Sequence, residues 1–65
     1  MNYLLEAIIK KAEGEIAVAK ANIMVYQRNP TAIGDHPNIV EAIETQIAII
    51  AEAHEKIETI KEHFS

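Results

Sequence analysis

The residues of this 65-residue sequence that could do chemistry are three histidines and a surplus of glutamates. His54 stands four residues before Glu58 and eight before Glu62, so all three would share one face of a helix. In an oligomer such faces could meet and bind a cation. The Glu-x-x-His pattern of di-iron helical bundles is absent, because Ala51 stands three residues before His54. A metal-binding bundle is therefore the third hypothesis for function.

Groups for other catalysis are scarce. The sequence has no cysteine, and its only serine is the terminal Ser65. No Gly-rich phosphate loop or nucleotide fingerprint is present. The glutamates of residues 52–62 alternate with Lys56 and Lys61, which is typical of a solvated helix face. We expect no enzymatic activity, no cofactor and no metal.

Two long helices must position these side chains. Apolar residues recur at alternating steps of four and three on both sides of a segment that holds Pro30, Gly34 and Pro37. The spacing predicts one helical-hairpin domain over residues 1–65, with helices at about 2–28 and 37–64 and a turn at 29–37. Asp35 could cap the second helix, and so could Asn38 with Glu41 three residues later.

The two apolar seams match each other when the chain folds back on itself. In an antiparallel hairpin Ile9 faces Ile57, Ile16 faces Ile50, and Ala12 faces Ala53. Small and large layers then alternate, and the axes approach closely. The one polar seam residue, Gln46, either sets register when buried or lies at the edge and reaches solvent. The expected hairpin core is Leu5, Ile9, Ala12, Ile16, Ala19, Ile23, Tyr26, Ile39, Ile43, Gln46, Ile50, Ala53, Ile57, Ile60 and Phe64.

More apolar residues remain than one seam can hide. They would form a larger exposed patch than soluble monomers usually show, which indicates a partner surface. The simplest partner is a second copy, giving a homodimeric, coiled-coil-like four-helix bundle; a different protein is the alternative. The expected interface is Leu4, Ile8, Val18, Met24, Val25, Val40, Ile47 and Ile49.

The first hypothesis for function follows from that surface. A small acidic protein with surplus apolar surface and few catalytic groups favours an interaction role, as an adaptor, inhibitor or assembly factor. Very short sequences of this kind are often encoded by accessory genes of phages and plasmids. By this association we add the hypothesis that the chain is a phage or plasmid accessory protein.

The second hypothesis concerns nucleic acid. In length, topology and alternating core layers the sequence resembles the ROP family of plasmid RNA-binding proteins, which implies an RNA-binding regulator. No motif is shared, and no functional residue is carried over. Lys10, Lys11, Lys56 and Lys61 would gather at the end remote from the turn, but ten acidic against six basic residues give a net charge of -4. That charge repels phosphate, so we expect no nucleic-acid partner.

The turn and the termini complete the expectations. Ile33 would either plug the end of the bundle, with capping residues around it, or belong to a recognition tip for another protein. A charge at Glu6 interrupts any signal-peptide apolar region, and the longest apolar runs, such as 47–51, are too short to span a bilayer. We expect a soluble cytoplasmic protein without membrane contact.

Overall fold

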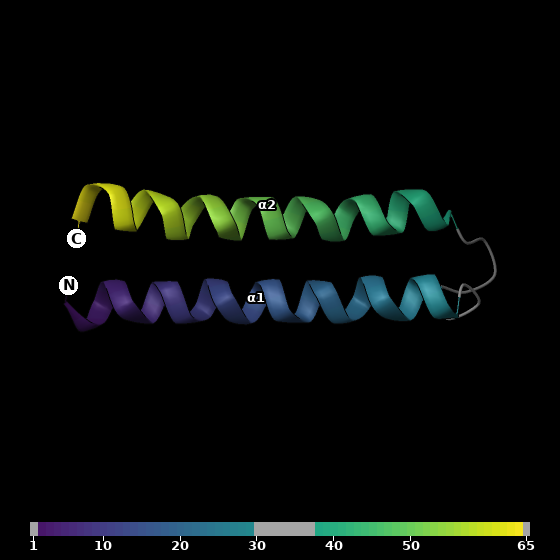
Figure 1. Ribbon diagram of the computed structural model, residues 1–65, viewed down its shortest axis with the longest axis horizontal. Helices are drawn as coiled ribbons and strands as arrows, with labels where there is room; N and C mark the ends of the chain where they lie inside the picture. Colours follow the sequence, from purple (N-terminus) through teal and green to yellow (C-terminus); the bar gives the residue numbers. More distant parts are fainter. Residues whose placement is uncertain (1, 30–37, 65) are drawn as a thin grey trace.

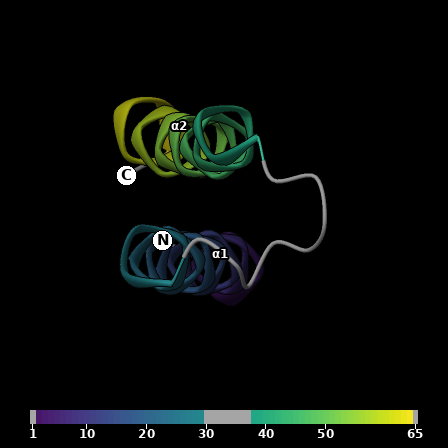
Figure 2. The same cartoon turned by 90° about the vertical axis from the view of Figure 1, so that its right-hand side faces the viewer.

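Two antiparallel helices make up the described part of the molecule. The computed structural model describes residues 2–29 and 38–64, which form α1 (Tyr3–Arg28) and α2 (Ile39–Phe64), each of 26 residues. Each helix is about 39 Å long. They lie side by side with both chain ends at the same end of the molecule (Figures 1 and 2). The all-helical hairpin predicted from the sequence is confirmed, and the helices begin one and two residues later than expected.

Asparagine caps begin both helices. The Asn2 side chain accepts a hydrogen bond from the Leu5 N–H at 2.9 Å. The Asn38 Oδ1 accepts from the Glu41 N–H at 2.9 Å, and its Nδ2 donates to Glu41 Oε2 at 3.2 Å. Asn38 therefore caps α2, as one of the two sequence-based alternatives proposed; Asp35 lies outside the described residues. Each cap satisfies a backbone donor that the helix itself cannot.

The helices pack along the predicted seam. The buried side chains among the described residues are Ala12, Ala19, Ala53, Ile57 and Ile60. Ile9 and Ile16 pack against a cluster of Ala12, Ala53 and Ile57. The pairing of Ala12 with Ala53 sets the register: three residues forward on α1 correspond to three residues back on α2. Half-buried residues extend the seam in both directions: Leu5, Ile23, Tyr26, Ile39, Ile43, Gln46 and Ile50.

The core assignment of Phe64 is wrong. Its side chain is 57% exposed. In the register set by Ala12 and Ala53, Phe64 lies level with the first two residues of the chain, before α1 begins. No helical side chain is therefore opposite it. Phe64 instead stacks edge-on with its neighbour His63, with ring centroids 6.5 Å apart.

The core is thin for a chain of this size. The molecule measures 45 × 15 × 14 Å and has a radius of gyration of 14.6 Å. A compact 65-residue domain would have about 11 Å. Viewed end on, the two helices form a single layer, and no third element covers either flank in the described part (Figure 2). Two helices alone cannot enclose the apolar residues of this sequence.

Candidate interaction surface

The exposed large apolar residues are the most distinctive feature of the surface. All eight residues of the expected interface are exposed, from 39% at Ile49 to 77% at Val40. Tyr3 and Phe64 are exposed as well. The structure therefore leaves on the surface the residues that the seam could not accommodate.

These residues do not form one patch, because the seam separates two flanks. On the first, which we call the groove flank, Leu4, Val18 and Val25 share one position of the seven-residue repeat, and Ile8 and Ile49 lie beside the seam. On the second, the opposite flank, lie Tyr3, Met24, Val40 and Ile47. The sequence-based interface is thus divided between two sides of the hairpin.

A shallow groove marks the first flank. A hollow of about 360 Å³ opens between the helices, and Val18 of α1 and Ile49 of α2 line it, together with Gly14, Glu15, Ala19, Asn22 and Gln46. A smaller hollow of about 100 Å³ continues it along α2, past Glu52, Ala53 and Lys56. A Cβ added at Gly14 would meet nothing within 4 Å, so this position leaves open space beside the groove. The exposed lining of the groove is mostly apolar.

One polar pair crosses the seam at the end of the groove. The Asn22 Nδ2 donates to Gln46 Oε1 at 3.1 Å, and both residues are half-buried. Gln46 was expected either to set register or to reach solvent; it bonds across the hairpin and remains partly accessible. Sequence reasoning missed Asn22, although it is one of only two polar residues between Ile16 and Tyr26.

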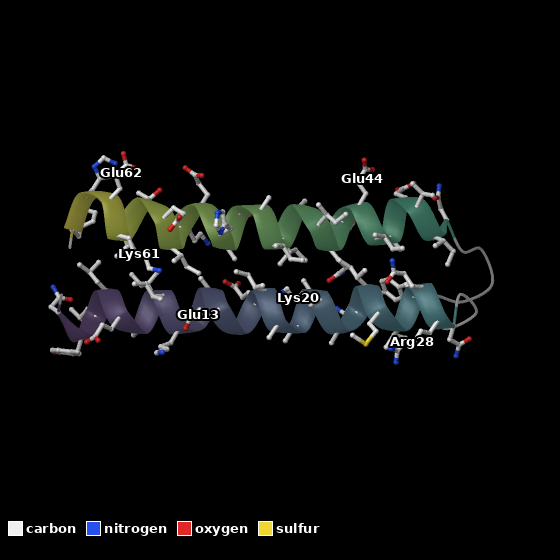
Figure 3. The ribbon with its side chains drawn as sticks, viewed as in Figure 1. Glu13, Lys20, Arg28, Glu44, Lys61 and Glu62 are labelled. Atoms are coloured by element: carbon white, nitrogen blue, oxygen red, sulfur yellow. The ribbon has the colours of Figure 1, made fainter. Side chains whose placement is uncertain are left out.

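The charged residues lie around the apolar flanks. Lys10 pairs with Glu13 and Lys56 with Glu52, each at 3.5 Å within its own helix. In Figure 3 Glu44 and Glu62 point away from α1, on the outer face of α2. Lys10 and Lys56, which were expected to belong to a basic end, are therefore partnered by carboxylates, which lowers their net attraction for phosphate.

The candidate metal-binding side chains on α2 do not form a cluster in the described part of the chain. No group of three or more His, Asp or Glu side chains is placed to hold a metal ion within residues 2–29 and 38–64. His54, Glu58 and Glu62 lie on exposed positions of α2. No buried side-chain polar atom in this part of the chain lacks a hydrogen-bond partner. The turn residues 30–37, including His36 and Ile33, lie outside the described residues. The two alternatives for Ile33, a plug for the end of the bundle or part of a recognition tip, therefore concern residues outside the described part.

Comparisons with known proteins add no functional residue. A scan against models of protein families, a search of curated proteins and a search of solved structures each found no match to this chain. Neither described helix is long and apolar enough to cross a membrane.

Proposed function

We propose that this chain is a small non-catalytic interaction protein that acts through helix-face contacts and works as a homodimeric four-helix bundle. The observation that supports this is that fewer side chains are buried than large apolar side chains are exposed. Five side chains are buried among the described residues, whereas ten large apolar side chains are exposed. Interaction surfaces, rather than monomer surfaces, carry such apolar area.

The accessible area agrees with a missing partner. The chain exposes 4935 Å². A compact monomer of this mass exposes about 4,100 Å². The excess of about 800 Å² reflects the elongated two-helix shape, which leaves both flanks uncovered. Covering one flank with a second hairpin would bring the protein to an ordinary ratio of surface to mass.

A second copy is the simplest cover. A two-fold homodimer is the commonest soluble oligomer, and each copy supplies the same apolar flank to the other. Two hairpins packed flank to flank form a four-helix bundle with two layers instead of one. Such a dimer leaves the opposite flank, with Tyr3, Met24, Val40 and Ile47, available to a further protein. An adaptor, inhibitor or assembly factor would act through that remaining surface.

Thermal unfolding at different protein concentrations tests the proposal. Folding that is coupled to association makes the midpoint of unfolding rise with concentration, because the dimer dissociates as it unfolds. We expect a clear rise of the circular dichroism midpoint over a hundredfold concentration range. A midpoint that stays constant over that range would contradict self-association.

A further inference from the structure

The opposite flank, which the proposed groove contact leaves open, carries a row of residues on each helix. In the half of the flank nearer to residues 28 and 39 the rows are Ala17, Lys20 and Met24 on α1 and Val40, Glu44 and Ile47 on α2. All of these residues are exposed, Val40 to 77% and Ile47 to 54%. Lys20 and Glu44 belong to neither of the ion pairs described above. Both charges are therefore available to an outside partner.

The register of the hairpin fixes the level of each of these residues along the long axis. Ala12 packs with Ala53, so residues of the two helices are level when their numbers add up to 65. The pairs Lys20 and Glu44, Met24 and Val40, and Ala17 and Ile47 each add up to 64. The members of each pair are therefore within about one residue, roughly 1.5 Å, of the same level. Within one hairpin they project from the same flank of neighbouring helices and do not face each other.

A second hairpin brings the members of each pair face to face. When two copies join their opposite flanks about a two-fold axis parallel to the helices, α1 packs on the partner's α2. Rotation about that axis moves no atom along it, so the levels are those of the single hairpin and the two copies cannot slide past each other. Lys20 then faces the partner's Glu44, and Glu44 faces the partner's Lys20. The register within one hairpin therefore determines every contact of this arrangement.

The contacts determined in this way match in kind. The ion pair joins opposite charges and occurs twice, as an isologous interface requires. Met24 meets the partner's Val40 on one side of this ion pair, and Ala17 meets the partner's Ile47 on the other. One axis, with no register left to choose, therefore places apolar residues on apolar ones and a positive charge on a negative one.

The match ends toward the chain termini. There Glu6 is level with the partner's Glu58, so like charges meet. The favourable contact is thus confined to residues 17–24 of α1 and 40–47 of α2, whereas the apolar residues of the groove flank extend from Leu4 to Val25. We expect this contact to be weaker than the groove contact and to form at concentrations above those that form the dimer.

We propose that the opposite flank is a second self-association surface, which binds another copy of this chain about a two-fold axis parallel to the helices. Met24, Val40 and Ile47 supply the apolar contact, and Lys20 and Glu44 the reciprocal ion pairs. Self-complementary charge in a register that cannot slide identifies the occupant as the same chain. The contact joins the dimers of the proposed function, and that role rests on the proposed function. Because each dimer exposes this flank on both outer sides, dimers add one to another.

Disulfide capture tests this arrangement directly, because the chain has no cysteine of its own. Full-length Met24→Cys and Val40→Cys chains are mixed in equal amounts in a glutathione buffer, and mass spectrometry quantifies the linked products. Both positions are exposed, to 48% and 77%, so the hairpin tolerates the substitutions. Chance pairing gives the mixed disulfide about a twofold excess over each homodisulfide, whereas we expect at least about a tenfold excess, since bridging requires Cα atoms within about 7 Å. Met24→Cys mixed with Ala48→Cys, which places the second cysteine on the outer face of α2, should give chance pairing.

Charge reversal in both cysteine chains tests the ion pair. Lys20→Glu should lower the excess of mixed disulfide at least about threefold, because each contact then joins two carboxylates, and the further change Glu44→Lys should restore it. An excess that Lys20→Glu leaves unchanged would overturn the inference.

The distribution of products separates the remaining outcomes. A predominant homodisulfide of the Met24→Cys chain would indicate another packing and overturn the inference. Chance pairing would overturn it as well and leave the opposite flank to a different protein. Light scattering on the unaltered chain distinguishes the two proposals. A dimeric chain with chance pairing refutes this inference alone, whereas a chain that stays monomeric refutes the proposed function.

Discussion

Replacing Val18 by glutamate should separate the dimer with little effect on the hairpin. The Val18 side chain is 63% exposed in the hairpin, so a glutamate there strains no internal contact. Full burial of a valine contributes about 1.5–3 kcal/mol. The exposed share therefore leaves about 1–2 kcal/mol to be gained on association, and the dimer contains this residue twice. The variant therefore loses about 2–4 kcal/mol of association free energy per dimer, before the cost of desolvating two carboxylates.

The expected result is a dissociation constant at least about a hundredfold higher than that of the unaltered chain. Sedimentation equilibrium measures it, and far-ultraviolet circular dichroism follows the helix content of the same samples. Val40→Glu is the matched control, because Val40 has the same residue type, lies on the opposite flank and is 77% exposed. It lies away from the groove flank, so its dissociation constant should change less than about threefold.

Two outcomes would refute this reasoning. An equal loss of affinity in both variants would show that the dimer contact is not confined to the groove flank. Unchanged affinity in both would show that the groove flank is not the dimer interface. A loss of helicity in Val18→Glu alone would still trace to association, because the substituted position is open to solvent in the hairpin.

Four further predictions concern the hairpin and its shape. Ile57→Ala removes a side chain that is only 8% exposed, and we expect a loss of about 2–3 kcal/mol in urea unfolding. Asn38→Ala removes the bond to the Glu41 N–H and should cost about 1 kcal/mol in the same assay. Gly14→Ala meets no neighbour, so it should gain about 1 kcal/mol from helix propensity and raise the midpoint by about 4–8 °C in a thermal scan at fixed concentration. Since the single hairpin has a radius of gyration of 14.6 Å, small-angle scattering should give the dimer about 15 Å for flanks in contact with axes about 10 Å apart; an end-to-end dimer would exceed about 25 Å.

Much of the fold could be predicted from the sequence because hydrophobic periodicity and turn chemistry agree. The alternating four and three spacing specifies helices, and the matched seams specify the register in which Ala12 meets Ala53. The exposure of Phe64 could not be predicted in this way, because hydrophobic periodicity describes one helix at a time. Whether a partner residue lies opposite depends on where the other helix begins.

The candidate surface was predicted in part. Counting apolar residues beyond the seam identified the exposed ones, since a two-helix hairpin has no other interior. Their division into two flanks requires the angular position of each residue relative to the packed seam. The Asn22–Gln46 bond, at 3.1 Å across the hairpin, also depends on the tertiary register.

The mass of the chain in solution tests the central claim most directly. Light scattering after size exclusion, across a hundredfold range of concentration, distinguishes the 7.2 kDa chain from its assemblies. Self-association through the groove flank predicts about 14 kDa, falling toward the chain mass only at the lowest concentrations. A mass of 7.2 kDa at every concentration would contradict it, and would leave the exposed apolar flanks to a different protein.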